Sequence, residues 1–175
     1  MSEHKRDSIR RRHAPQLQED RIVYYPLPDL LEAGQQLAFQ DRLGLLSLLA
    51  VDPATNLPRL FAQEQFSFQE IRVLVPLLEN YPDYCPHEVM FANFYNGSVT
   101  EKTIARARER LQEAQFAGVW DYELRPVRNV LSRTRQKLSS FGIDIRSILE
   151  TGYLLKPLRE RGNRGKERRD QGEGV

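Results

Sequence analysis

The feature that most constrains this chain is a basic, amphipathic stretch in its last third, residues 124–138. The stretch contains five arginine or lysine residues and no aspartate or glutamate. Successive residues of a helix are turned by about 100°, and at that angle one arc of mainly apolar side chains forms. The residues on this arc are Val127, Val130, Leu131, Thr134 and Leu138. The pattern predicts a helix over 125–138 with one side in the core and the other in solvent.

The opposite side of this predicted helix carries groups that can read bases. These are Arg125, Arg128, Asn129, Ser132, Arg133 and Gln136. Arginine can form paired hydrogen bonds with guanine, and asparagine or glutamine can form them with adenine. Arg135 and Lys137 lie at the flanks, where they suit phosphates. Solvated helix faces usually mix charge signs and this one does not, so contact with DNA is favoured over simple solvation.

Charge is segregated along the chain, although the net charge is only +2. Residues 1–21, 124–140 and 156–175 have surpluses of two, five and three positive charges, which leaves the remainder at −8. This distribution favours a polyanionic partner at the basic segments. Residues 1–21 and 158–175 lack apolar periodicity, and we expect a disordered basic arm and a disordered basic tail. RNA binding through these two segments is a further, weaker alternative.

The first half of the predicted domain is mainly extended. Residues 22–66 favour a small antiparallel sheet, with a short helix allowed near 29–36. An apolar run at 43–51 precedes a turn composition, and a strand there is preferred to a helix that periodicity alone leaves open.

Three helices are predicted between this sheet and the basic helix. Ser67-Phe68-Gln69-Glu70 matches a capping box and predicts a helix to Asn80, kinked or ended early by Pro76. A second helix is expected from Pro86 to about Tyr95, closed by Gly97. Ser98-Val99-Thr100-Glu101 matches another capping box, and the helix after it should stop at Gly118.

Alternating residues at 145–155 predict a β-hairpin. The chain is therefore expected to be an α+β domain over 22–157, mainly β at 22–66, helical at 67–140 and a hairpin at 141–157.

Residues from about 57 to 157 resemble the winged helix-turn-helix DNA-binding domain of the OmpR/PhoB class of bacterial response regulators. The resemblance rests on the order and spacing of four motifs. The first motif is Ser67-Phe68-Gln69-Glu70-Ile71, and the second is Glu88-Val89-Met90 with Phe94-Tyr95-Asn96-Gly97. The third follows the recognition-helix pattern V-x-x-x-I-S-R-L-R-x-K-L and consists of Val127, Leu131, Ser132, Arg133, Arg135, Lys137 and Leu138. The fourth follows the wing pattern and consists of Ile145-Arg146-Ser147-Ile148 with Gly152-Tyr153.

The resemblance implies an N-terminal four-stranded sheet, three core helices and a C-terminal wing. It also implies a transcriptional regulator whose recognition helix, residues 125–138, enters the major groove of double-stranded DNA. Arg146 and Tyr153 join the helix residues above as expected DNA contacts. Leu149 and Glu150 depart from the family, which often has arginine and glycine there. The residues ahead of position 57 are too few for a receiver domain, so we expect a stand-alone module.

Residues 98–123 are longer than the corresponding family loop and predict an inserted helix. In the family this loop can contact RNA polymerase, so that enzyme or another protein is a candidate partner for 98–123. The family's use of repeated DNA half-sites allows a homodimer. The alternative function is a protein-interaction module that has kept the winged-helix scaffold and lost DNA binding.

Enzymatic and metal chemistry find little support in the sequence. Cys85 is the sole cysteine, and His87 beside it lacks further ligands at zinc-site spacing. No phosphate-binding glycine loop is present, and we expect no enzyme and no cofactor. Trp120 and Tyr122 are expected to pack in the core rather than stack on bases. With neither an apolar run of the roughly 18–20 residues that cross a bilayer nor an export signal, we expect a cytoplasmic protein without membrane contact.

Overall fold

An antiparallel sheet with its strands in chain order forms the N-terminal part of the molecule. The structure is a computed structural model that describes residues 21–158, so the predicted arm and tail, apart from Arg21 and Leu158, lie outside the described residues. The strands are β1 (Ile22–Tyr25), β2 (Gln35–Gln40), β3 (Leu45–Val51) and β4 (Pro58–Gln65). In register, Leu37 faces Leu48 and Phe39 faces Leu46, and all four are buried. Alternation therefore places one face of this sheet in the core.

The strand prediction for 43–51 is confirmed, and the short helix allowed near 29–36 is wrong. Residues 28–34 form turns, and the amides of Leu30 and Leu31 both donate to the Leu27 carbonyl. Asp29 has φ 65°, in the left-handed region that a right-handed helix excludes. The turn delivers the chain directly into β2.

Helix α1 (Phe68–Asn80) begins at the predicted capping box and does not end early at Pro76. Proline has no amide hydrogen, so the Arg72 carbonyl loses its helical partner. The side-chain amide of Asn93 replaces it, donating to the Arg72 carbonyl at 2.7 Å. An interaction with a neighbouring helix thus compensates for the local defect.

That neighbour is α2 (His87–Asn96), which ends at Gly97 with φ 67° as predicted. Helix α3 (Glu101–Phe116) follows, but its capping box is not the predicted one. Thr100 is the N-cap, and the Thr103 hydroxyl accepts a bond from its amide at 2.9 Å. A threonine three residues after the cap can reciprocate as glutamate does, which moves the start by two residues.

The basic helix is α4 (Trp120–Leu138), which starts five residues before the predicted boundary at 125. Pro126 lies inside the helix, in its second turn. Asp121 and Glu123 stand in the first turn, where negative charge is favourable, and Leu124 is buried. Trp120 packs partly buried against the core, as expected, whereas Tyr122 is 69% exposed and the expectation that it packs inside is wrong.

The C-terminal hairpin follows a short 3-10 turn, η1 (Ser139–Phe141). It consists of β6 (Ile143–Ile148) and β7 (Gly152–Pro157), and it confirms the predicted hairpin. The short strand β5 (Cys85–Pro86) adds to β7, giving the order β5-β7-β6. A Cβ atom on Gly152 would lie 2.1 Å from the Cys85 carbonyl oxygen, so only glycine allows this approach.

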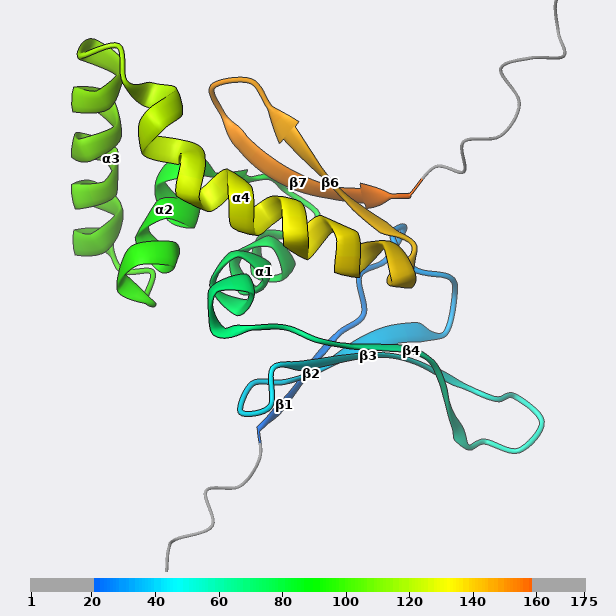
Figure 1. Cartoon of the computed structure of the whole chain (residues 1–175). Coiled ribbons are helices and arrows are strands. Elements are labelled where there is room, and N and C mark those ends of the chain that lie inside the picture. The colour runs from blue at the N-terminus through cyan, green and yellow to red at the C-terminus, as the bar shows by residue number, and fades with distance from the viewer. Residues whose placement is uncertain (1–20, 159–175) are drawn as a thin grey trace, which may run out of the picture.

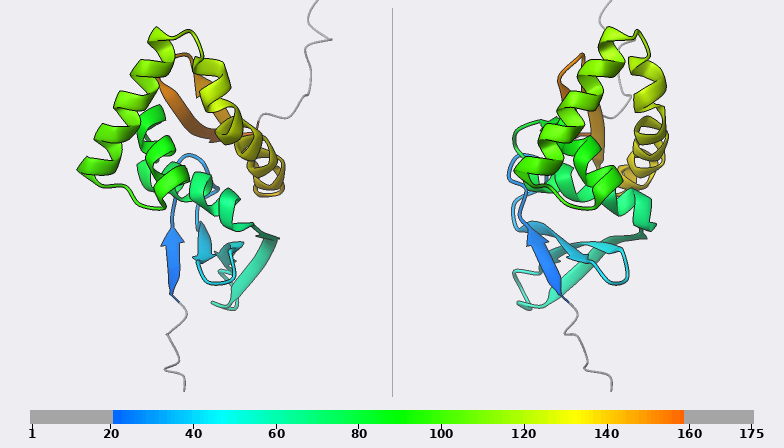
Figure 2. Two further views of the ribbon diagram at one scale, coloured as in Figure 1. Left: turned by 60° about the vertical axis from the view of Figure 1, so that its left-hand side comes forward. Right: turned by 90° about the vertical axis from the view of Figure 1, so that its left-hand side faces the viewer.

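The α+β architecture is thus a four-stranded sheet, four α-helices and a C-terminal hairpin in residues 21–158. Helix α1 lies between the first sheet and α4, while α3 packs on α2 at the far side (Figures 1 and 2). One continuous hydrophobic core joins both sheets to the helices. None of the helices in this part of the chain combines the length and apolarity required to span a membrane.

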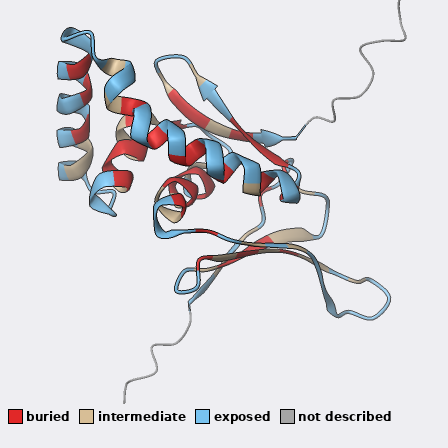
Figure 3. Ribbon diagram, viewed as in Figure 1, coloured by how far each residue is buried: buried red, intermediate tan, exposed pale blue. Residues whose placement is uncertain are grey.

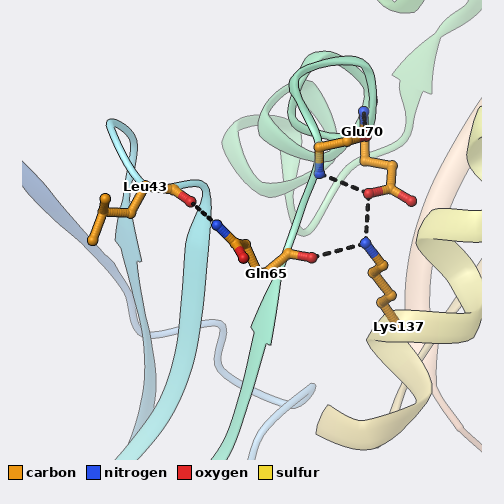
Figure 4. A network of polar contacts seen from close by, with 5 residues as sticks. Leu43, Gln65, Glu70 and Lys137 are labelled. Carbon is orange, nitrogen blue, oxygen red and sulfur yellow. Dashed lines mark hydrogen bonds and ion pairs between the residues drawn. The ribbon is translucent and has the colours of Figure 1, made fainter.

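A polar network ties three elements together at the centre of the fold (Figure 4). The Lys137 ammonium of α4 donates to the Glu70 carboxylate of α1 at 2.7 Å and to the Gln65 carbonyl of β4 at 2.8 Å. The Ser67 amide donates to the same Glu70 oxygen at 2.8 Å. Burial alone would raise the pKa of Glu70, but these hydrogen bonds outweigh it and hold the pKa below its ordinary value.

We expect Lys137→Met to destabilise the protein more than Glu70→Gln does. Loss of the ammonium leaves a buried carboxylate without a countercharge, at a cost of about 3 kcal/mol. Glutamine can keep the capping box, and Lys137, whose side chain is 32% exposed, can turn toward water. Urea unfolding at pH 7 measures both changes, and equal costs would contradict this reading.

The same network predicts acid sensitivity. Because the folded-state pKa of Glu70 is lower than the unfolded-state value, its stabilisation is complete at neutral pH. The stabilisation begins to be lost as the pH falls past about 4.3 and is gone below the lowered folded pKa. Unfolding free energy measured between pH 7 and pH 3 should fall less steeply in Glu70→Gln than in the unaltered protein.

Candidate nucleic-acid interface

The two sides of α4 separate as the sequence pattern predicts. The inner arc of Val127, Val130, Leu131, Thr134 and Leu138 is buried. The predicted base-reading residues Arg125, Arg128, Asn129, Ser132, Arg133 and Gln136 are all exposed (Figure 3). The Thr134 hydroxyl is buried without a hydrogen-bond partner in the described structure. The helix therefore presents its polar residues outward in one band.

A buried carboxylate, Asp144 at the start of β6, links this helix to the hairpin. Its Oδ1 lies 3.2 Å from Nε of Arg135, and its Oδ2 lies 2.7 Å from Nε of Arg146. Arg135 also donates to the Ile145 carbonyl. Because one anion holds both side chains, the helix and hairpin arginines are kept at fixed positions beside each other.

Arg128 and Tyr153 meet on the other side of the helix–hairpin junction. Arg128 pairs with Asp121 at 2.7 Å, an ion pair that is largely exposed. Tyr153 is buried, and burial raises the pKa of its hydroxyl while the nearby Arg128 guanidinium opposes this rise. The phenol is therefore neutral at physiological pH and remains a hydrogen-bond donor.

Between α4 and the hairpin lies a hollow of about 210 Å³, which we call the helix–hairpin hollow. It is lined by Arg128, Leu131, Ser132, Arg135, Ile145, Ser147 and Tyr153. Four of these, Arg128, Ser132, Arg135 and Tyr153, are predicted site residues, and the fold brings them together. Arg125, Asn129, Arg133 and Gln136 lie outside the hollow on the open face of α4.

Lys137 is placed differently from the expectation. Its ammonium points to Glu70 and Gln65 and lies over the Phe66 ring, 5.3 Å from the centroid. The predicted phosphate contact would have to replace these interactions, so its observed role is to hold α4 on the domain. No local feature of the chain indicates this role, because Glu70 precedes Lys137 by 67 residues.

Sequence reasoning overlooked Asp144 and Ser147. A usable signal existed for Asp144, which is the one acidic residue between positions 124 and 149. An isolated aspartate flanked by two isoleucines, close to a basic helix, indicates a paired carboxylate. Ser147 gave no such signal, since a serine on a hairpin strand is ordinary.

The residues considered for metal or nucleophilic chemistry are enclosed by the core. His87 contacts the rings of Trp120 and Tyr153, and burial, helped by Arg128, lowers its pKa. Burial raises the pKa of the Cys85 thiol to about 12, which leaves it protonated and unreactive. Within residues 21–158, no group of three or more His, Cys, Asp or Glu side chains is placed to hold a metal ion.

Comparison with protein-family models, curated proteins and solved structures found no match to this chain.

The unequal environments of two aspartates give a testable contrast. Asp144→Asn should lower the unfolding free energy by about 1.5 kcal/mol, because charged hydrogen bonds from Arg135 and Arg146 weaken around a buried group. Asp121→Asn removes an equally short ion pair from an exposed carboxylate and should cost under about 0.5 kcal/mol. Urea denaturation of both variants measures the difference; a cost for Asp121→Asn as large as that for Asp144→Asn would contradict the assignment.

Proposed function

We propose that this protein is a sequence-specific, double-stranded DNA-binding transcriptional regulator of winged helix-turn-helix type. Helices α1, α2 and α4 correspond to the three core helices of the winged helix-turn-helix fold. Helix α3 is an insertion between the second and third of these core helices. Helix α4 is the recognition helix that enters the major groove. The hairpin β6–β7 is the wing and lies against the flanking backbone.

The observation that carries this proposal is the composition of the exposed face of α4. Between positions 124 and 138 this face carries four exposed arginines and no anionic residue, because the fifth cation of the stretch, Lys137, is turned to Glu70. Helix α3 serves as an internal comparison, since its exposed side mixes arginine and lysine with Glu101, Glu109 and Glu113. Beyond its first turn, where the exposed Asp121 pairs with Arg128, α4 presents a cationic face with asparagine, glutamine and serine between the arginines. Such a face combines attraction to phosphates with base-edge recognition.

The dimensions of α4 suit the same role. Its 19 residues form a cylinder about 28 Å long, and the major groove of B-DNA admits one α-helix. Arg133 forms no ion pair with any residue in the described range, so its guanidinium is available to a guanine edge. On the hairpin, Arg146 is the exposed cation nearest the helix, while the tip ends in Leu149, which is 88% exposed. The tip also carries the exposed, anionic Glu150, so the proposed contact of the wing with the DNA backbone falls to Arg146 and not to the tip.

A second candidate function, protein interaction without DNA binding, is favoured by one specific surface. At the corner between α3 and α4, Phe116 is 97% exposed, Tyr122 is 69% exposed and Val119 is 45% exposed. Exposed aromatic side chains gathered in this way are typical of protein contacts. This corner is the part of 98–123 that would take RNA polymerase or another protein, whether or not DNA also binds. Homodimer formation on repeated half-sites stays a prediction.

We expect selection from a random duplex library to recover a preferred sequence, with Arg133 and Asn129 each reading a base. Arg133→Ala and Asn129→Ala should each relax the preference at one position by about 1–3 kcal/mol, which is the value of a paired base contact. The measurement is the dissociation constant of each variant for the selected duplex and for single-base replacements of it.

Arg106→Ala on the exposed side of α3 is the matched control and should leave affinity and preference unchanged. The logarithm of the binding constant should fall steeply with the logarithm of the salt concentration as phosphate contacts release counterions. Failure to recover any duplex, together with a pulled-down partner lost in Phe116→Ser, would replace this function with the second candidate.

A further inference from the structure

The helix–hairpin hollow has a lining that is cationic and rich in hydroxyl groups. Two guanidinium groups, from Arg128 and Arg135, stand at its edge, and hydroxyl groups come from Ser132, Ser147 and Tyr153. No carboxylate lines it. A ligand with a negative charge and several acceptor oxygens would complement these polar groups, whereas a cation would not.

Tyr153 is the least expected member of this lining. It is only 4% exposed, and its hydroxyl oxygen is shielded from solvent beside the Arg128 guanidinium, whose interaction with the hydroxyl opposes the rise that burial causes in its pKa. An edge-to-face contact with the His87 ring, 5.0 Å between centroids, supports the Tyr153 ring from the core side, so the ring forms a firm wall of the hollow.

The cations are held in place by groups outside the hollow. Nε of Arg135 pairs with Asp144, and one terminal nitrogen of Arg135 donates to the Ile145 carbonyl. The other terminal nitrogen has no partner among the described residues. Asp121 holds Arg128 through one terminal nitrogen. Guanidinium groups that are already ordered lose less conformational entropy when an anion arrives.

The size of the hollow limits the ligand. Its volume of about 210 Å³ is below the roughly 300–1,000 Å³ of pockets that hold drug-sized ligands. Leu131 and Ile145 provide apolar surface beside the polar groups. One tetrahedral oxyanion with a short attached group fits this space and this donor set.

We propose that the helix–hairpin hollow binds a single phosphate group. If the proposed function holds, on which this assignment of the source rests, the group is one backbone phosphate of the DNA beside the bases read by α4. Ser132 and Arg135 from the helix and Ser147 from the hairpin would then contact the same phosphate. A phosphate held by both elements fixes the position of α4 along the groove.

The first arm of the test needs no DNA. Sodium phosphate is titrated into the full chain at constant ionic strength while backbone amides are followed by NMR. Saturable shifts are expected at Ser132, Ser147 and Tyr153. Ser147→Glu, an exposed position where the new carboxylate occupies the hollow, should abolish them, and Ser132→Ala should weaken them. Gln112→Glu adds the same charge to the exposed side of α3 and should respond like the unaltered protein.

The second arm uses the selected duplex with single methylphosphonate replacements, which remove one phosphate charge at a time. One replacement should weaken binding about tenfold in the unaltered protein and in Gln112→Glu, but should have no further effect in Ser147→Glu.

The outcomes separate the two proposals. If Ser147→Glu removes the effect of one methylphosphonate replacement, the hollow holds a phosphate of the DNA backbone. If phosphate gives saturable shifts but no replacement behaves in this way, the hollow holds a free phosphate or a phosphorylated small molecule. If neither the saturable shifts nor the loss of the methylphosphonate effect is seen, the inference is overturned even if DNA binds. If no duplex is recovered, the DNA proposal fails and the inorganic phosphate titration alone decides the hollow.

Discussion

The orientation of α4 depends on the ion pair between Lys137 and Glu70. An apolar stripe fixes the rotation of a helix only loosely, because neighbouring side chains can repack. A buried carboxylate is stricter, since it must keep its hydrogen bonds and its countercharge. Glu70 is held at the start of α1 by the capping box and Lys137 is bonded to the end of β4, so α4 has one rotation that satisfies all three elements. That rotation directs the Arg133 side of the helix to solvent.

Local chemistry predicted most elements of the fold, and long-range partners explain most of the errors. Capping boxes, glycine stops and strand alternation are read within a few residues, and they gave α1, α2, β3 and the hairpin. Pro76 shows the limit: the loss of a helical hydrogen bond is predictable, but its replacement by Asn93 depends on the packing of α1 against α2. Lys137 shows the same limit within the candidate site. Its basic character was evident in the sequence, whereas its buried partner was not.

The acidic residues near the interface act as supports for its cations. Asp144 lowers the local positive charge by one, yet it holds Arg135 and Arg146 from two different elements at its two oxygens. A free arginine loses much rotamer entropy on binding a phosphate, and an ordered one has already lost it during folding. Asp144 thus slightly lowers the long-range attraction of this surface for an anion, but it gives the two arginines a defined geometry. This is the balance that the proposed sequence-specific binding of DNA would require.

Helix α3 restricts how the proposed recognition helix can approach a groove. Arg110 of α3 pairs with Glu123 of α4 and lies over the rings of Phe91 and Tyr95, so the insertion is fixed to the domain. Its corner with α4 stands at the N-terminal end of the helix (Figure 1). Helix-turn-helix proteins usually read bases with this end. With bulk at that position, the groove is better reached by the middle of α4, residues 128–136, where the exposed band and the helix–hairpin hollow lie together.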